Sequence, residues 1–296
     1  MTVTTKTEPA GGDATVPTPP AASAAGSVAV AAALTALVLA LGVVDITQGT
    51  AAVGAADVWK AFTGHADPGG TSVVIASRLP RMAAGVLVGA TLGIAGFVLQ
   101  AISRNVLASP DTLAVNAGAY LALATLAVTG ASFPLVASSG VAFAGGLVAA
   151  AVVLALSGLG AGTVRLILAG SALALGLGSV TDALLVLFPE RTQGLYRWGQ
   201  GGIGQNGFGG VAQMAPLALL GLMGLLLIAR RTDALALGDD AARGLGVPVR
   251  GTRVTAVVFA TLLSAAAVTL AGPIGFVGLC APQIVRALAR RFRAFA

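Results

Sequence analysis

TLAVNAGAYLALATLAVTG, residues 112–130, is followed after a short break by PLVASSGVAFAGGLVAAAVVLALS, residues 134–157, and neither segment contains a charged side chain. A helix that crosses a lipid bilayer needs about 20 mainly apolar residues. The uncharged stretch at 112–164 is too long for one such helix, and residues between Gly130 and Pro134 interrupt it. It therefore predicts two consecutive membrane-spanning helices.

The composition of the whole chain also indicates a lipid environment. Of its 296 residues, 56% are hydrophobic and 9% are charged, and the mean hydropathy is +0.93, whereas about 25% of residues in soluble domains are charged. The net charge is +6, but the basic residues lie in short gaps between apolar runs and not on one face with interleaved aromatic residues. The composition excludes a soluble domain. We expect the chain to contact membrane lipid and not nucleic acid.

Division of the apolar runs at charged residues, Gly and Pro predicts an all-α polytopic membrane protein with about eight transmembrane helices. The eight intervals are 27–44, 82–101, 112–130, 134–157, 164–188, 211–229, 254–271 and 274–289. Residues 1–26 are rich in Thr, Pro, Ala and Gly and lack hydrophobic periodicity, which predicts a disordered cytoplasmic tail ahead of a transmembrane domain at 27–296.

The distribution of basic residues predicts the orientation of the helices. With the N-terminus in the cytoplasm, twelve of the 17 Lys and Arg residues fall on the inner side of the eight-helix arrangement and five on the outer side. Cytoplasmic loops carry an excess of Lys and Arg. Both ends of the chain are therefore expected inside the cell, and the protein is expected in the cell membrane.

The longest inner segment, 230–253, is predicted to contain a short helix. Its centre, residues 237–248, reads LGDDAARGLGVP. Asp239 and Asp240 suit the positive end of a helix dipole, and Arg243 follows Asp239 by four residues, a spacing at which opposite charges attract on one face.

The end of this short helix is marked by glycine. Gly244 or Gly246 suits the left-handed position after a helix, and Pro248 follows. A helix of about two turns is not stable alone in water. It must dock on its own bundle or on a cytoplasmic partner, and the physical chemistry of the sequence favours neither.

Asp182 is the one acidic residue well inside a predicted span. Ionisable residues in membrane segments usually face a wet cavity, so Asp182 is a candidate for a translocation path; alternatively, it lies near enough to the outer surface to stay hydrated. The following gap, 189–210, is glycine-rich around Trp198 and too polar to span a membrane. It is expected to form an outer loop or a re-entrant piece that lines a cavity.

Arg78 and Arg81 belong to the sequence RLPR, which precedes the second predicted span on its outer side. Proline is favourable in the first turn of a helix. The two arginines could reach lipid phosphates or present their guanidinium groups to an acidic partner outside the cell.

Small residues recur at four-residue spacing in two predicted spans. This spacing places them on one face of a helix, where they allow neighbouring backbones to approach closely in lipid. We expect them to form helix contacts. The residues are Gly85, Gly89 and Gly93 in the second span and Gly170, Ala174 and Gly178 in the fifth.

Several kinds of chemistry are missing from the sequence. Neither of the two lysines, Lys6 and Lys60, lies in a glycine-rich loop of the kind that binds nucleotide phosphates. One cysteine, Cys280, and one histidine, His65, cannot build a disulfide framework or a Cys/His metal cluster. We expect no catalytic residue, no cofactor and no metal site, so any ATP-derived work must come from a partner.

A series of motifs resembles one family, the FecCD-type permeases of ABC importers for iron-siderophores and cobalamin. The resemblance covers about residues 57–290, in order and at matching spacing. The motifs are RLPR at 78–81, Gln100, RNVLASPD at 104–111, NAGA at 116–119, RLILAG at 165–170, Trp198 with Gly199, LGDDAARGLGV at 237–247, GPIGFVGL at 272–279, and Pro282.

The resemblance implies a transport subunit, not an enzyme, which passes an Fe(III)-siderophore into the cytoplasm as a dimer with a second copy or a paralogue. It also implies cytoplasmic ATP-binding subunits that hydrolyse ATP and grip the short helix of segment 230–253. The residues implied for that contact are Asp239, Asp240, Ala241, Arg243, Gly244, Leu245 and Gly246.

An extracytoplasmic substrate-binding lipoprotein is the third implied partner, and its glutamates are expected to bind Arg78 and Arg81. Candidates for lining the translocation path are Asp182, Trp198 and Asn116.

The chain departs from the family pattern in three places. The family usually has ten spans, so a chain that ends at Ala296 is expected to lack about two C-terminal helices. Gln283 stands where a histidine is common, and Val106 stands where a proline is common.

Other functions remain open at this point. Cobalamin or haem is an alternative cargo. An ion-driven secondary transporter is an alternative class, and it is expected to carry more charge inside its spans. A membrane-embedded scaffold or enzyme is another, and it is expected to carry paired acids or histidines at one depth. Among acidic residues and histidines, the predicted spans contain Asp182 alone.

Overall fold

The computed structural model describes residues 24–47, 74–130, 135–157, 163–204 and 207–294, and all regular structure in these ranges is helical. Lys6, Lys60 and His65 lie outside the described residues, as do residues 1–23 of the predicted tail. The elements are α1 (Ala24–Thr47), the π-helical turn η1 (Val74–Arg78), α4 (Leu79–Ser103), the 3-10 turn η2 (Asp111–Leu113), α5 (Val115–Val128), α6 (Leu135–Ser157), α7 (Thr163–Leu187), α8 (Pro189–Gly199), α9 (Gly209–Leu227), α10 (Ala229–Ala236), α11 (Asp239–Gly244), α12 (Val249–Ala271) and α13 (Val277–Ala294).

Each of the eight predicted intervals contains a helix, which confirms the all-helical polytopic fold. Six helices are long and apolar enough to cross a membrane: α1, α4, α6, α7, α9 and α12. Two are shorter than a full span, α5 with 14 residues and α13 with its apolar part at Val277–Ala289. Left-handed Ala114 precedes α5, and left-handed Phe276 precedes α13, so backbone turns shorten both helices.

Five predicted helix starts are wrong by three to five residues. α1 begins at Ala24 and not at residue 27, α4 at Leu79 and not at 82, α5 at Val115 and not at 112, α12 at Val249 and not at 254, and α13 at Val277 and not at 274. The predicted spans 82–101 and 254–271 begin directly after Arg81 and Arg253. The observed helices α4 and α12 include these arginines, because a long arginine side chain can reach water from inside a helix. The start of α1 likewise lies within the predicted tail of residues 1–26.

The glycine-rich gap 189–210 is only partly the irregular segment that was predicted, because residues 189–199 form α8. Pro189 occupies the first position of this helix, where its missing N–H costs no hydrogen bond. Glu190 lies in the first turn, where a negative charge is favourable.

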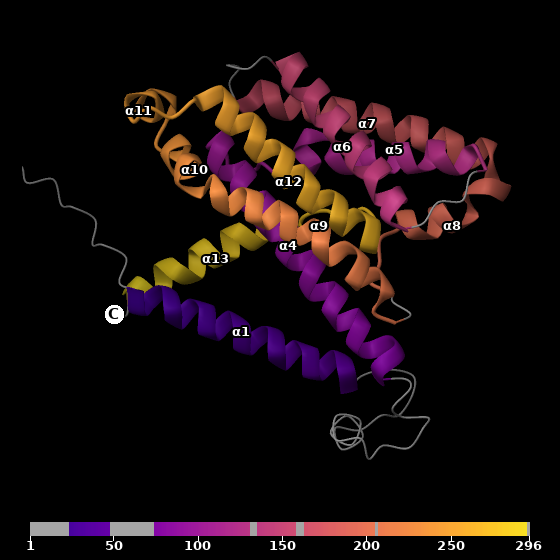
Figure 1. Cartoon of the computed structure of the whole chain (residues 1–296), viewed down its shortest axis with the longest axis horizontal. Coiled ribbons are helices and arrows are strands. Elements are labelled where there is room, and N and C mark those ends of the chain that lie inside the picture. Colours follow the sequence, from indigo (N-terminus) through magenta and orange to yellow (C-terminus); the bar gives the residue numbers. More distant parts are fainter. Residues whose placement is uncertain (1–23, 48–73, 131–134, 158–162, 205–206, 295–296) are drawn as a thin grey trace, which may run out of the picture.

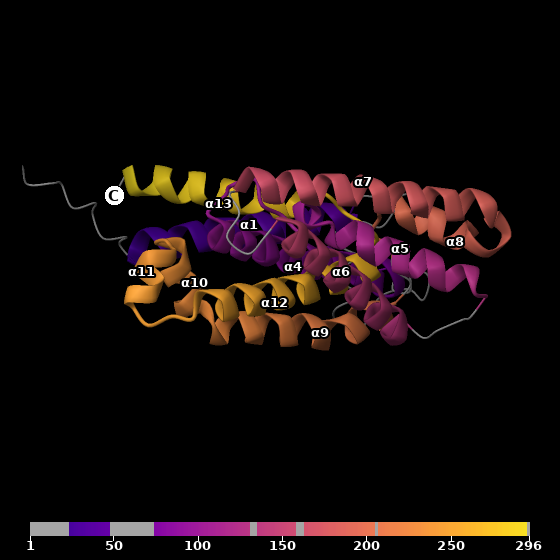
Figure 2. The same cartoon turned by 90° about the horizontal axis from the view of Figure 1, so that it is seen from above.

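The most buried long helix is α12. It packs against α4, α9, α6 and α5, and 78% of its apolar stretch is buried, compared with 11% for α7 and 17% for α1. Figure 1 shows α12 beside α9 and α4, with α1 and α13 on one side and α7 and α8 on the other. In Figure 2, α11 and the C-terminal end of α13 lie at one end of the long axis, and α8 lies at the other.

Several close contacts in the bundle depend on glycine, and the two tightest involve Gly96 and Gly170. A Cβ atom at Gly96 of α4 would overlap the carbonyl oxygen of Gly278 in α13, and one at Gly170 of α7 would overlap the carbonyl oxygen of Thr112. The backbones therefore touch at these points, as small residues allow in membrane bundles.

The predicted small-residue faces are partly right. Gly170 is a close contact, and a Cβ atom at Gly85 or Gly93 would make an ordinary contact. Gly89 and Gly178 face open space, so the tightest contact of α4 lies at Gly96, outside the predicted series.

A buried amide fastens α13 to α4 close to Gly96. Gln100 of α4 donates from Nε2 to the carbonyl oxygen of Leu279 at 3.1 Å, and its Oε1 accepts from Gln283 Nε2 at 2.8 Å and from Arg286 Nη1 at 3.0 Å. The Arg286 guanidinium also lies 5.4 Å from the centre of the Phe97 ring. Both polar atoms of this buried side chain are thereby hydrogen-bonded to α13.

A second polar group connects the start of α5 with α12 and with the segment before α13. Asn116 donates from Nδ2 to Asp111 Oδ1 at 2.5 Å and accepts at Oδ1 from Ser264 Oγ at 3.0 Å. Burial raises the pKa of the Asp111 carboxyl above its ordinary value of 3.8, and hydrogen bonds from Asn116 and from the backbone of Phe276 partly offset this rise. Burial therefore disfavours the charged form of this carboxyl, and the two hydrogen bonds favour it.

We expect Gly96→Ala to destabilise the protein, because the new methyl group must displace the backbone of α13. The expected loss is about 1 to 3 kcal/mol, as for other overpacked sites, measured as a lower Tm in detergent. Gly89→Ala on the same helix is the matched control, and it should leave the Tm unchanged or raise it. Equal Tm values for the two variants would contradict the assigned contact.

The raised pKa of Asp111 predicts a pH dependence of stability. Because the folded pKa lies above the unfolded value, Asp111 favours the folded state most at low pH, and this contribution is lost as the pH rises from 3.8 through the folded pKa. Asp111→Asn carries no proton to lose, so its Tm relative to wild type should increase across that window. Parallel curves of Tm against pH for the two proteins would show that burial does not perturb this carboxyl.

Candidate functional site

The short helix predicted at residues 237–248 is present as α11. Gly238 precedes it with φ 120°. After the helix, Gly246 adopts φ 74°, its N–H donates to the carbonyl of Arg243 at 2.9 Å, and the N–H of Val247 donates to the carbonyl of Ala242 at 2.9 Å. This pair of hydrogen bonds around a left-handed glycine is a Schellman motif, so Gly246, and not Gly244, takes the left-handed position after the helix.

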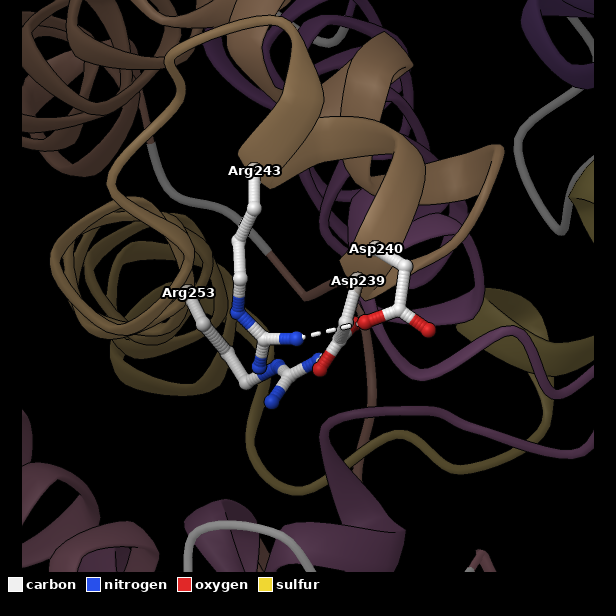
Figure 3. Close-up of polar contacts among 4 residues, drawn as sticks. All are labelled: Asp239, Asp240, Arg243 and Arg253. Atoms are coloured by element: carbon white, nitrogen blue, oxygen red, sulfur yellow. Dashed lines mark hydrogen bonds and ion pairs between the residues drawn. The ribbon is translucent and has the colours of Figure 1, made fainter.

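The two acidic residues of α11 have different partners (Figure 3). Arg243 Nη1 donates to Asp240 Oδ1 at 2.7 Å within the same helix. Arg253 Nη2, in the second turn of α12, donates to Asp239 Oδ1 at 3.0 Å and to Oδ2 at 3.3 Å. The spacing-based pairing of Asp239 with Arg243 is therefore wrong, because a tertiary contact with α12 takes Asp239 instead.

The two ion pairs also differ in their exposure to water. The side chains of Arg253 and Asp239 are 21% and 27% exposed, whereas those of Arg243 and Asp240 are 61% and 100% exposed. Water and salt weaken an ion pair more as its groups become more exposed. The first pair can hold α11 against α12, and the second lies on the free surface.

α11 has one packed face and one open face. Ala242 is fully buried in the main core cluster, so the helix docks on its own bundle. Ala241, Arg243, Gly244, Leu245 and Gly246 are exposed together with Asp240. The open face combines charge with the apolar side chain of Leu245, a composition suited to a protein partner.

The two arginines of the RLPR motif lie at the start of α4, and their environments differ. Arg78 is buried, with 7% exposure, and its Nη1 donates to the carbonyl oxygen of Ile46 at the end of α1. Arg81 is 60% exposed, and its Nε lies 3.7 Å from Asp45 Oδ1. Arg81 is open to a partner, whereas Arg78 joins two helices of the chain itself.

The three candidates for a translocation path make different contacts. Asp182 is exposed and lines a shallow pocket of about 460 Å³ between the end of α7 and α8. Trp198 packs at 5.6 Å on the ring of Tyr120 and donates from Nε1 to the carbonyl of Thr269 at 3.4 Å. Asn116 is buried and uses its amide in the contacts described above.

The pocket is mainly apolar and contains one carboxylate. Its lining residues come from the last turns of α7 and from α8: Asp182, Leu185, Val186, Pro189, Thr192, Gln193 and Tyr196. Part of the glycine-rich gap 189–210 therefore lines a cavity, and this part is the helix α8. Among the described residues, no three His, Cys, Asp or Glu side chains lie close enough to hold a metal ion.

Arg253 is a residue of this site that sequence reasoning missed. It lies fourteen positions after Asp239, on the next helix, and no helical spacing connects the two. The position of Arg253 could have indicated such a contact. An arginine in the second turn of an apolar helix must be hydrated or paired with an acidic side chain.

The chain matches known proteins along most of its length. The model of the FecCD transport family matches residues 36–295. The Fe(3+)-citrate import system permease protein YfmD of Bacillus subtilis (strain 168) is 39% identical over 73% of this chain and 65% of its own length. The ferric enterobactin transport system permease protein FepD of Escherichia coli (strain K12) is 34% identical over 88% of this chain and 80% of its own length.

A third relative and a solved structure agree with these. The iron(3+)-hydroxamate import system permease protein FhuB of Bacillus subtilis (strain 168) is 32% identical over 82% of this chain and 64% of its own length. The chain thus spans between 64% and 80% of these three relatives. A protein assigned to the metal-chelate type of ABC transporter, solved in an inward-facing conformation, superposes with a TM-score of 0.73 at 25% identity over 88% of this chain and 81% of that one.

The sequence motifs, the helical bundle and the comparisons therefore agree on one assignment. The chain is a multi-pass protein of the cell membrane. By the match over residues 36–295 and the identities with several relatives, it belongs to the FecCD transport family.

Proposed function

We propose that the chain is the permease subunit of an ABC importer that passes an Fe(III)-siderophore into the cytoplasm. The observation that carries the proposal is the family match at residues 36–295, which includes α11 with its open face. The relatives are named for Fe(3+)-citrate, ferric enterobactin and iron(3+)-hydroxamate, so a ferric chelate is the cargo class they support. The protein itself provides the helical bundle, which is accessible at both ends, and it neither makes nor breaks covalent bonds.

Cytoplasmic ATP-binding subunits are the proposed partners of α11. The chain has no glycine-rich nucleotide loop, so ATP must be hydrolysed elsewhere. The open face of α11, with Asp240, Arg243 and Leu245 exposed, supplies both a charged and an apolar contact. ATP binding by the partner would move this helix and bias the bundle between outward and inward access.

A substrate-binding lipoprotein is the proposed partner at the end of the bundle opposite α11, where Arg81 is exposed.

A second copy or a paralogue is the proposed partner within the plane of the membrane, and the exposure of α7 supports this. This helix is the least buried of the long helices, and Leu168, Leu175 and Val186 are exposed along it. Asp182 lies on the same helix, so a path between two subunits would pass its pocket.

The function is tested by iron uptake in cells that lack the chromosomal copy and carry it on a plasmid. Radioactive iron is supplied as citrate, catecholate and hydroxamate chelates, and the wild-type chain should restore uptake of at least one. Arg243→Glu should abolish uptake and co-purification of the ATP-binding subunit, because it places a third negative charge beside Asp239 and Asp240. The amount of the variant in the membrane should equal wild type, and unchanged uptake with unchanged co-purification would contradict the assigned contact.

The two arginines of the RLPR motif should give different results. Arg81→Glu should slow association with the substrate-binding protein, with a smaller effect at high salt, because exposed charges act mainly on the association rate. The Tm in detergent should stay close to wild type. Arg78→Gln should instead lower the Tm, because it removes a buried hydrogen bond between η1 and the end of α1. Equal association rates for Arg81→Glu and wild type would remove Arg81 from the docking surface.

A further inference from the structure

We propose that the ion pair between Asp239 and Arg253 transmits the movement of α11 to α12, which makes Arg253 a positioning residue for transport. The inference rests on the proposed function of α11 as the contact for the ATP-binding subunit. It names the link through which a movement at that contact reaches the centre of the bundle.

The link must be held by few groups, because α11 is only six residues long. It packs against α10 and α12, and its one buried side chain is that of Ala242. A single small apolar residue allows a short helix to slide or rotate on its support. Arg253 reaches both oxygens of the Asp239 carboxylate from one nitrogen, Nη2, at 3.0 and 3.3 Å, and this charge-assisted contact holds the start of α11 against α12.

The environment of this pair favours transmission. Both side chains are about three-quarters buried, so the attraction is less screened than in an exposed pair. The pair of Asp240 and Arg243 lies within α11 and is open to water. It can contribute to the contact with a partner, but it does not connect α11 to another helix.

α12 is suited to carry the movement across the protein. Its 23 residues form a rod of about 35 Å. Near its middle, Ser264 Oγ donates to Asn116 at 3.0 Å. At its far end, Thr269 accepts from Trp198 Nε1 at 3.4 Å, and Ala271 accepts from the N–H of Gly202 at 2.8 Å. These contacts connect a displacement of the Arg253 end to α5, to α8 and to the segment after α8.

The test uses the complete complex of this chain with its ATP-binding subunits and substrate-binding protein in proteoliposomes. The readouts are co-purification of the ATP-binding subunits and the amount of ferric chelate transported per ATP hydrolysed. Arg253→Gln and Asp239→Asn each remove one charge of the pair, and Arg253→Lys keeps the charge. Arg250→Gln is the matched control, because Arg250 is an exposed arginine of the first turn of the same helix.

We expect Arg253→Gln to assemble with the ATP-binding subunits and to lower transport per ATP by about five- to tenfold. Arg253→Lys should retain most of the coupling, and Arg250→Gln should match wild type. The double variant Asp239→Asn with Arg253→Gln should be no worse than the more affected single variant, because both changes break one interaction. If Arg253→Gln does not fold, Asp239→Asn, which preserves the side-chain shape, decides the question.

The inference alone would be overturned by a wild-type ratio of transport to ATP hydrolysis in Arg253→Gln or Asp239→Asn, or by additive losses in the double variant. A loss of assembly in Arg253→Gln with an unchanged ratio in the complexes that remain would also overturn it. A wild-type complex that transports no ferric chelate would instead overturn the proposed function, and the inference with it.

Discussion

The close packing of α12 against four neighbours is the contact on which the rest of the structure depends. Between lipid-facing helices the hydrophobic effect provides no driving force, so association relies on close approach and internal hydrogen bonds. α12 supplies both. Ala260, Ala265 and Ala266 are fully buried and let neighbouring backbones approach, and Ser264 in the same stretch donates to Asn116 of α5.

This central helix also explains why the functional groups lie at the ends of the bundle. Polar groups near the middle, such as Asn116 and Ser264, satisfy one another, because an unpaired polar group in lipid is costly. Charged side chains are free to meet partners only where the helices end. Arg81 lies exposed at one end and the open face of α11 at the other, with α12 between the two regions.

Hydropathy and spacing predicted the helices well but the contacts between them poorly. The eight apolar intervals and the helix at residues 237–248 follow from local rules, namely the length of apolar runs, helix capping and the left-handed glycine at Gly246. The pairing of Asp239 with Arg253 and the burial of Arg78 against Ile46 depend on which helices become neighbours, and that information is not present in any one segment. The close contact at Gly96 was missed for the same reason, because a glycine matters only where another backbone approaches it.

In the proposed mechanism, α11 and α12 move as one unit because Asp239 and Arg253 join them. The most direct measurement replaces this ion pair by a removable bridge. Both residues are changed to Cys in a Cys280→Ser background, which leaves no other thiol because the chain has one cysteine, and the complex is assembled with cysteine-free partner subunits. Transport of ferric chelate per ATP hydrolysed is measured before bridging, after treatment with a short bis-methanethiosulfonate reagent, and after release with dithiothreitol.

We expect poor coupling without the bridge, recovery with it, and loss again on release. A ratio that is the same in all three states would contradict the claim, because it would show that transport does not require a connection between α11 and α12 at this point.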